Sequence, residues 1–167
     1  MQLPCVMEHH SNAVIADSVA TFKQRSKWRG ESMNVFIVED SEVVREHMES
    51  MLSAIPGVEV VGYAADELGA IERINALLPD VVTLDISLQP GSGIRVLENI
   101  KKQHPSIKVI VLTNYTDEFY ANGCKRAGAD CFFDKTFQFS RVRSALWSWI
   151  HADQMGNKSA VLREPEK

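Results

Sequence analysis

The strongest constraint on this chain is an alternation between short apolar runs and amphipathic helical segments, which continues from Asn34 to Ile150. The apolar runs are rich in β-branched and aromatic residues, as expected for strands that are buried on both faces. These runs are 35–38, 58–63, 81–84, 107–112 and 131–133. Such alternation predicts an α/β fold, a doubly wound five-stranded parallel sheet with helices on both faces and right-handed crossovers.

Capping residues and apolar spacing place the helices between these strands. Ser41, Asp66 and Ser92 stand where three helices begin, and Thr116 or Asp117 stands before a fourth. Apolar residues then recur every three or four positions, which is typical of a helix with one buried face. For the second helix, the predicted buried residues are Leu68, Ile71, Ile74 and Leu78.

Composition divides the chain into three parts, which are 1–33, 34–152 and 153–167. In the first part, the apolar spacing predicts a short helix over residues 13–22. The segment that follows, residues 23–30, contains four basic residues. We expect this basic segment to be a solvated linker, with binding to an anionic partner as the alternative. A translation start at Met33 is a further alternative. The last part is polar and predicts a tail outside the folded domain.

Charge and cysteine content exclude several classes of protein. With 18 basic and 22 acidic residues the net charge is −4, which argues against a protein that coats nucleic acid and against direct DNA binding. The three cysteines have no CxxC spacing, so neither a zinc site nor a disulfide framework is expected. No apolar run approaches the roughly 18 residues of a membrane span, and the N-terminus lacks the basic start of a secretory signal. A reduced, cytoplasmic setting is therefore expected.

Reactive side chains follow four of the five predicted strands. Glu39 and Asp40 follow the first strand, Asp85 the third, Thr113 the fourth and Lys135 the fifth. Each of these residues taken alone has an ordinary explanation as a solvated or strand-closing side chain. Together they are expected at one edge of the sheet, because the carboxyl ends of parallel strands share an edge. Ligands of such folds bind beyond that edge.

Clustered carboxylates repel one another unless a cation lies between them. Mg²⁺ suits such a site, since it binds one or two carboxylates and completes its shell with water and phosphate oxygens. An aspartate beside Mg²⁺ can act as a nucleophile and form an aspartyl-phosphate. Thr113 and Lys135 could then donate to the oxygens of a phosphoryl group.

The order and spacing of these residues resemble the receiver domain of bacterial two-component response regulators, across residues 34–152. The matching segments are Val38-Glu39-Asp40-Ser41, Leu84-Asp85-Ile86, Gly91-Ser92-Gly93, Val111-Leu112-Thr113 and 128–135. The resemblance implies a flavodoxin-like topology. It also implies a magnesium site in which Asp40, Asp85 and the backbone carbonyl of Ser87 bind the ion, while Glu39 acts through a bound water.

The same resemblance assigns the phosphoryl chemistry. Asp85 is implied to accept the phosphoryl group from a histidine kinase or a phosphotransfer protein. Thr113 and Lys135 are implied to bind the phosphoryl oxygens, and Phe132 to change rotamer together with Thr113. This change would remodel the face of the fourth helix, fifth strand and fifth helix, which is also the surface expected for a homodimer. The protein is thus expected to be a signalling phosphoacceptor that phosphorylates and dephosphorylates itself, and not an enzyme with a separate substrate.

Only 32 residues follow Lys135, so the sequence favours a stand-alone receiver without a DNA-binding output domain; its downstream target is unknown. Three positions depart from the family pattern. Thr136 stands where a proline with a cis peptide bond is usual, and a cis bond without proline costs about 2.5–4 kcal/mol. Asn114 stands where Ala or Gly is usual, and Pro90 lies one position later than usual. These departures remove no chemical group, so we expect them to change rates.

Two other functions stay open. One is a receiver-like binding module that is never phosphorylated. The other is a phosphatase of the haloacid dehalogenase superfamily, which also uses an Asp nucleophile with Mg²⁺. Such phosphatases need a second Asp two residues after the first, and this chain has Ser87 there.

Overall fold

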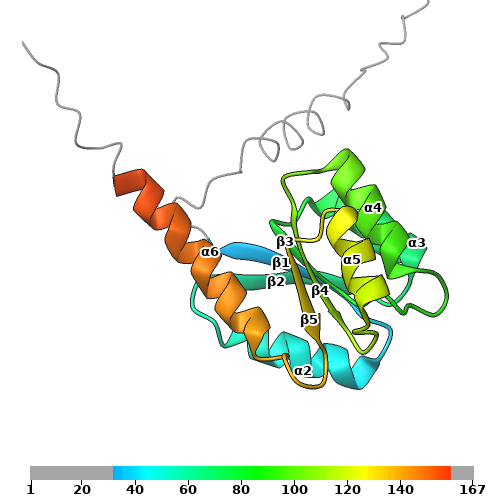
Figure 1. The fold of residues 1–167 in the computed structure, drawn as a ribbon. Helices are drawn as coiled ribbons and strands as arrows, with labels where there is room; N and C mark the ends of the chain where they lie inside the picture. Colours follow the sequence, from blue (N-terminus) through cyan, green and yellow to red (C-terminus); the bar gives the residue numbers. More distant parts are fainter. Residues whose placement is uncertain (1–31, 159–167) are drawn as a thin grey trace, which may run out of the picture.

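Five parallel strands form one sheet at the centre of the protein (Figure 1). In this computed structural model residues 32–158 are described, so the helix expected at 13–22 and the basic segment 23–30 lie outside the described residues. The strands are β1 (Met33–Val38), β2 (Val58–Ala64), β3 (Val81–Leu84), β4 (Lys108–Thr113) and β5 (Cys131–Asp134), in the spatial order β2-β1-β3-β4-β5. The predicted fold class is confirmed.

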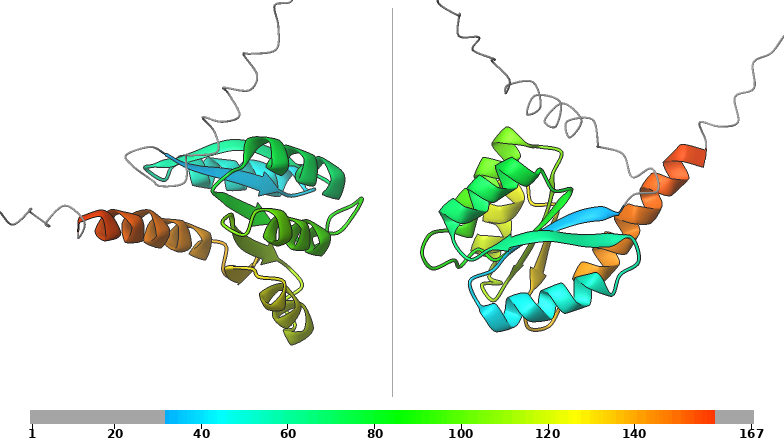
Figure 2. Two further views of the ribbon diagram at one scale, coloured as in Figure 1. Left: turned by 90° about the horizontal axis from the view of Figure 1, so that it is seen from above. Right: turned by 180° about the vertical axis from the view of Figure 1, so that it is seen from behind.

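The helices lie in two layers, one on each face of the sheet (Figures 1 and 2). They are α2 (Glu42–Ser53), α3 (Glu67–Leu77), α4 (Gly93–Gln103), α5 (Glu118–Arg126) and α6 (Arg141–Lys158). Helices α3, α4 and α5 cover one face and α2 and α6 cover the other. Each layer has its own apolar core: Ile74, Leu97 and Cys124 lie in the first, and Leu52 and Leu146 lie in the second.

Helix α6 extends beyond the sheet (Figure 2). It reaches Lys158, six residues past the expected end of the domain at residue 152. Its first turns bury Val142 and Leu146 completely. The domain boundaries therefore stay predictions. Among the described residues, no helix combines the length and the hydropathy that a membrane crossing needs.

Helix starts differ in how they are capped. The Asp66 carboxylate accepts a hydrogen bond from the Gly69 amide at 2.8 Å, and Asp117 caps α5 in the same way. Ser41 and Ser92 occupy the N-cap positions of α2 and α4, but their side chains make no capping hydrogen bond. The amide of Ser92 instead donates to Glu67 Oε2, in α3, at 2.9 Å.

The buried side of α3 differs from the prediction. Leu68 is 77% exposed, and Leu78 ends the helix in a left-handed conformation with φ of 47°. Ala70 and Ile74 are the fully buried residues. Leu68 precedes Ala70 by two residues, which places it about 200° around the helix, on the side that faces away from the sheet.

Candidate phosphoacceptor site

The site lies where four neighbouring strands end. Because β1, β3, β4 and β5 are consecutive in the sheet and parallel, their carboxyl ends share one edge. Glu39 and Asp40 follow β1, Asp85 follows β3, Thr113 ends β4 and Lys135 follows β5. All five residues that the sequence predicted are thus brought to one place.

Backbone hydrogen bonds continue the sheet into the site. The Asp85 amide donates to the Val38 carbonyl at 3.0 Å, and the Lys135 amide donates to the Thr113 carbonyl at 2.9 Å. The first residues after these strands therefore keep the sheet's spacing. These hydrogen bonds fix the backbones of Asp85 and Lys135 relative to the neighbouring strands, although both residues lie outside the strands.

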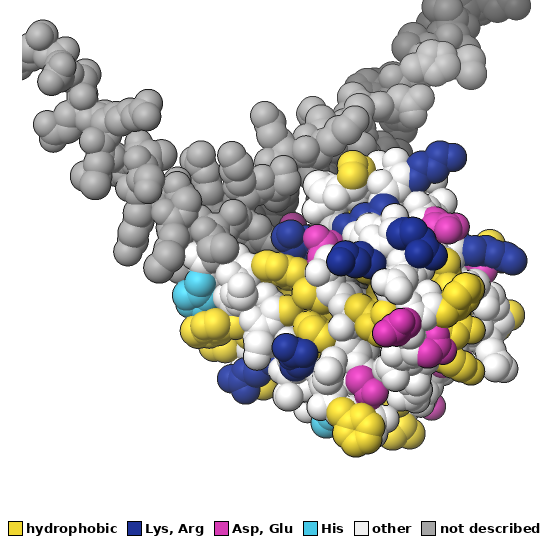
Figure 3. Space-filling model, viewed as in Figure 1, with side chains coloured by type: hydrophobic (Ala, Val, Ile, Leu, Met, Phe, Trp, Pro, Cys, Tyr) yellow, Lys and Arg dark blue, Asp and Glu magenta, His cyan; other side chains and the backbone are white. Residues whose placement is uncertain are grey.

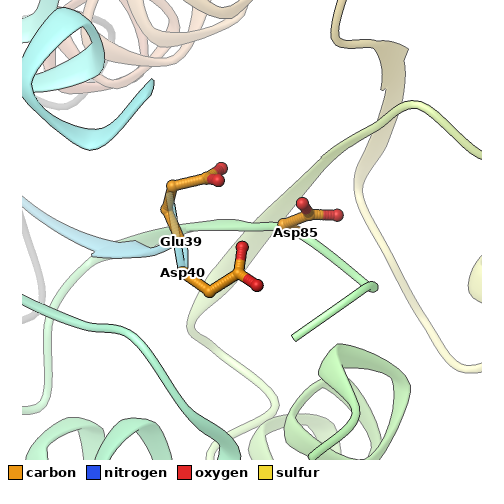
Figure 4. A group of neighbouring side chains, drawn as sticks. All are labelled: Glu39, Asp40 and Asp85. Atoms are coloured by element: carbon orange, nitrogen blue, oxygen red, sulfur yellow. The ribbon is translucent and has the colours of Figure 1, made fainter. Parts of the chain in front are cut away.

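Three carboxylates form a compact group (Figure 4). Glu39, Asp40 and Asp85 each offer an oxygen atom within 4.8 Å of the others. Glu39 and Asp85 are 2% and 4% exposed, whereas Asp40 is half-buried. The cluster is open to solvent on the side of Asp40.

Lys135 lies against two of these carboxylates. Its ammonium is 2.5 Å from Asp85 Oδ2 and 2.9 Å from Glu39 Oε2. Burial would lower the pKa of Lys135, but the hydrogen bonds to Asp85 and Glu39 outweigh burial and raise this pKa above its ordinary value of 10.5. Lys135 is therefore charged at neutral pH.

The charges at this edge suit a divalent cation. Three ionised carboxylates and one ammonium leave a formal charge of −2. Burial raises the pKa of Glu39 above its ordinary value of 4.5, although Lys135 and the Ser41 amide oppose this shift. The donors are all oxygen atoms, which are the ligands that Mg²⁺ prefers. The residues present therefore fit the expected metal.

Ser87 contacts the Asp85 side chain directly. Its amide donates to Asp85 Oδ1 at 3.1 Å, and its hydroxyl lies 3.2 Å from both carboxylate oxygens. The sequence expectation concerned the Ser87 carbonyl as a metal ligand, which stays a prediction. Two residues after Asp85 the chain thus offers a hydroxyl and an amide, where a haloacid dehalogenase would need a carboxylic acid.

Thr113 ends β4, and Phe132 lies in the neighbouring strand β5. Thr113 is fully buried, and its hydroxyl oxygen accepts a hydrogen bond from the Tyr115 amide at 3.3 Å. Phe132 pairs with Val111 in the sheet and packs against the apolar core beneath α3, α4 and α5. Their joint rotamer change stays a prediction.

A hydrogen bond joins the two loops beside the site. The Thr136 hydroxyl, after β5, donates to Asn114 Oδ1, after β4, at 3.3 Å. The carboxylate of Asp134 shapes the second loop by accepting from the amides of Thr136 and Phe137. Within residues 32–158 the cis peptide bond is Gln89–Pro90, so the bond before Thr136 is trans. Two of the three departures from the family pattern therefore contact each other, which spacing alone does not reveal.

Gly93 permits the close return of the loop that follows Asp85. A Cβ at this position would overlap the carbonyl oxygen of Asp85 and lie 2.6 Å from the Cα of Ile86. The Gly93 amide donates to the Ile86 carbonyl at 3.1 Å. Helix α4 thus begins directly against the backbone that carries the carboxylate. From the sequence, Gly93 was identified only as part of the segment Gly91-Ser92-Gly93, and its contact with Asp85 was not predicted.

Several known proteins are similar to this chain in sequence. Residues 35–147 match the response regulator receiver domain. The response regulator VraR of Staphylococcus saprophyticus is 32% identical over 114 residues, which are 68% of this chain and 54% of that protein. The DNA-binding transcriptional activator DevR/DosR of Mycobacterium tuberculosis is 37% identical over 114 residues, or 68% and 52% of the two chains. A protein-glutamate methylesterase/protein-glutamine glutaminase of Xanthomonas campestris is 44% identical over 85 residues, 51% of this chain and 24% of that enzyme.

Solved structures agree with the fold. The response regulator domain of Thermotoga maritima CheB has a TM-score of 0.64 and 31% identity, covering 74% of this chain and 96% of that one. CheY in the CheX-CheY-BeF3-Mg complex of Borrelia burgdorferi has a TM-score of 0.66 and 27% identity, covering 74% and 97%. The chain spans between about a quarter and about half of the length of the curated relatives named above. Residues 35–147 cover more than half of the chain, and by this match the protein belongs to the response regulator receiver domain family.

Proposed function

We propose that this protein is a phosphoacceptor switch of a two-component or phosphorelay pathway, with Asp85 as the phosphorylated residue. The observation that carries the proposal is the Asp85 carboxylate, 4% exposed, held between the Lys135 ammonium and the Glu39 and Asp40 carboxylates. A buried carboxylate with a fixed cation on one side and an oxygen-rich cation site on the other is arranged for phosphoryl transfer.

In the proposed reaction an Asp85 oxygen attacks the phosphorus atom of a phosphohistidine. The phosphorus–nitrogen bond breaks, a phosphorus–oxygen bond forms, and the histidine leaves with the electron pair of the broken bond. In this proposal Lys135 and Thr113 donate hydrogen bonds to the transferred oxygens. Glu39, Asp40, Asp85 and the Ser87 carbonyl would hold Mg²⁺, which neutralises charge on the phosphoryl group when bound. Water later attacks the same phosphorus and the bond between phosphorus and the Asp85 oxygen breaks. The carboxylate is restored, and inorganic phosphate leaves with both hydrogens of the water.

Partners are proposed on the same basis. The donor is a histidine kinase or a phosphotransfer protein, and the complex of CheX with CheY, BeF3 and Mg²⁺ supports the view that such folds bind partners when they carry a phosphoryl mimic. The output face is proposed to be α5, β5 and α6, next to Thr113 and Phe132. A homodimer through this face, and a cytoplasmic location, are part of the proposal.

Phosphorylation of Asp85 is tested with a small phosphodonor and Mg²⁺. Wild-type protein should gain the mass of one phosphoryl group, and the group should be labile to hydroxylamine. Asp85→Asn should gain none, while its far-UV circular dichroism stays unchanged. Full incorporation in Asp85→Asn would contradict the assignment, and no incorporation in the wild type would favour the non-phosphorylated binding module.

The metal site is tested separately with Asp40→Asn. Loss of one carboxylate should weaken Mg²⁺ binding and prevent phosphorylation, because Mg²⁺ is held by only one or two carboxylates. The expected loss of affinity is at least about tenfold, the scale for residues that support metal ligands. Glu42→Gln, at an exposed residue in the first turn of α2, serves as the control for loss of a nearby negative charge. Equal Mg²⁺ affinity in Asp40→Asn and Glu42→Gln would show that Asp40 is not a ligand.

A further inference from the structure

The loop that follows Asp85 is held at its far end by a residue of another helix. Glu67 is the first residue of α3, and its side chain is 15% exposed. Its Oε2 atom accepts a hydrogen bond from the Ser92 amide at 2.9 Å. Arg95, on α4, lies 3.6 Å from the same oxygen and is 72% exposed. One carboxylate therefore connects the start of α3 to the start of α4.

The backbone of this loop also lies directly on Glu67. The Glu67 amide donates to the Pro90 carbonyl at 3.4 Å. Gly91 has φ of +115°, and a Cβ there would overlap the Cβ of Glu67 and lie 3.2 Å from its backbone nitrogen. Only glycine, which has no Cβ, can pack this closely. The backbone of residues 90–92 is therefore held against Glu67.

The other end of the loop holds the phosphoacceptor. Ser87 donates both its amide and its hydroxyl to the Asp85 carboxylate, and Gly93 returns the chain to the Asp85 backbone. The segment from 85 to 93 thus has two fixed points: the Asp85 backbone at the sheet, and Glu67 at the far end. Ser87 lies between them.

We infer that Glu67 is a positioning residue of the magnesium site, which acts by holding the loop so that Ser87 faces the carboxylate cluster. The inference rests on the proposed function, because it concerns the same site. Glu67 touches neither the cluster nor the phosphoryl position. It acts through the Ser92 amide and the backbone of the loop.

Glu67 could also support Mg²⁺ binding through its charge, and this explanation predicts a different ranking of Mg²⁺ affinities among Glu67 variants. A carboxylate in the first turn of a helix also stabilises that helix through the helix dipole, and a nearby negative charge attracts Mg²⁺ through space. Both of these effects depend on charge. The hydrogen bond to the Ser92 amide depends instead on side-chain length, because the acceptor oxygen of residue 67 must extend to the start of α4.

Two substitutions of Glu67 separate charge from reach. Glu67→Gln keeps an acceptor oxygen at the same length and loses the charge, whereas Glu67→Asp keeps the charge and is one methylene shorter. If Glu67 acts by position, Glu67→Gln should keep Mg²⁺ affinity within about threefold of wild type, and Glu67→Asp should lose about tenfold, the usual scale for residues that support metal ligands. Glu72→Gln, at an exposed position on the same helix, should match wild type.

The measurement is calorimetric titration of the full chain with Mg²⁺ alone, followed by beryllofluoride at saturating Mg²⁺. Circular dichroism in EDTA checks that each variant is folded. The reverse order, with Glu67→Asp like wild type and Glu67→Gln weakened, would overturn the inference in favour of a charge effect. Wild-type affinity in both variants would overturn it as well. Asp40→Asn is included so that the two proposals fail separately: if Asp40→Asn also binds like wild type, the proposed metal site is wrong, and if only Asp40→Asn is weakened, the role of Glu67 alone is wrong.

Discussion

Lys135 contacts two buried carboxylates at once. Its ammonium contacts Asp85 at 2.5 Å and Glu39 at 2.9 Å. These contacts offset part of the cost of burying the two acids, although burial still raises the pKa of Glu39. A phosphoryl group on Asp85 would present its own anionic oxygens to Lys135. These oxygens would take the place of the carboxylate oxygen that Lys135 now contacts. The same ammonium can therefore serve the site before and after phosphorylation without leaving it.

Asn114 is expected to slow reactions at Asp85. Its side chain, which is larger than the Ala or Gly usual there, is held by the Thr136 hydroxyl at 3.3 Å across the two loops that flank the site. A donor or a water must approach in line with the bond that breaks. We predict that Asn114→Ala increases the rates of both phosphorylation and self-dephosphorylation roughly two- to fivefold, the equivalent of one exposed hydrogen bond.

The Asn114 prediction is checked with one small phosphodonor at saturating Mg²⁺. Thr136→Val should move both rates in the same direction, because it removes the hydroxyl that orients Asn114. Thr116→Ala, at an exposed residue of the same loop, should leave the rates unchanged. Equal rates in wild type and Asn114→Ala would show that Asn114 points away from the approach path. Slower rates in Asn114→Ala would show that Asn114 instead positions the phosphoryl group.

At the scale of elements, α4 is expected to tolerate no side chain at its first residue. A Cβ on Gly93 would overlap the Asp85 carbonyl, so Gly93→Ala must push the helix from the sheet. We predict that it lowers the free energy of unfolding by about 3 kcal/mol, at the upper end for an overpacked site, and weakens Mg²⁺ binding. The matched control is Gly123→Ala in α5, where a Cβ meets nothing within 4 Å.

Helix propensity predicts the opposite sign for that control. Alanine is favoured over glycine by about 0.8–1 kcal/mol inside a helix, so Gly123→Ala should stabilise the protein slightly. Urea unfolding followed by circular dichroism measures both variants. A neutral Gly93→Ala would mean that α4 can shift without disturbing the backbone of Asp85.

Asp130 connects α4, β4 and the turn before β5. Its carboxylate contacts Lys101 at 2.7 Å and accepts from the Val109 amide at 2.8 Å. Burial would raise the pKa of Asp130, but these hydrogen bonds outweigh burial and hold this pKa below its ordinary value of 3.8. The stabilisation is therefore present above pH 3.8 and is lost as the pH falls through the lower value of the folded state.

We predict that Asp130→Asn lowers the free energy of unfolding by about 2 kcal/mol at pH 7, the usual scale for hydrogen bonds to charged groups. The difference from wild type should shrink as the pH falls below about 4, where the wild-type carboxyl is protonated in the unfolded state. Chemical unfolding at several pH values measures it, with exposed Glu98→Gln on α4 as the control. A difference that is constant from pH 7 to pH 3 would contradict an ionic role.

The elements were predictable because their signals are local. The strand 81–84 matches β3 without change, since its apolar run is bounded by turn residues. The buried side of α3 was not predictable from the sequence. Ala70, which is buried, contributes little to an apolar pattern, whereas Leu68, which is exposed, contributes much. The site residues followed from strand order. The contact of Glu67 with Ser92 had no such signal, since 25 residues separate them and their contact depends on how two helices pack.

At the scale of the whole molecule, the two ends of the sheet carry different side chains. Lys and Arg gather on the upper part of the face in Figure 3, over the last turns of α4 and α5, which hold Lys101, Lys102, Lys125 and Arg126. Exposed aromatic residues, among them Phe119 and Phe137, follow the carboxyl ends of β4 and β5. The edge of the sheet that carries Asp85 is therefore partly lined by apolar side chains, whereas the last turns of α4 and α5 are basic.

A ligand at Asp85 should stabilise the whole domain. Binding to the native state alone adds about 2.7 kcal/mol at a concentration of 100 times Kd, which corresponds to a rise in Tm of roughly 10 °C for a domain of this size. We predict this rise for wild type with Mg²⁺ and beryllofluoride together. Asp85→Asn should show no response to beryllofluoride, and fluoride without beryllium should have no effect on either protein. A rise of equal size in Asp85→Asn would place the ligand elsewhere.

The site depends on four strands that are distant in the sequence. β1, β3, β4 and β5 each supply part of the site, so no fragment of the sheet contains it, and a slip of β5 by one residue would turn the side chains at its end to the opposite face. Phosphorylation would then act as a test of folding. A donor could modify only those molecules whose central sheet is complete, so the strength of the signal would follow the number of correctly folded copies and not the total amount of the protein.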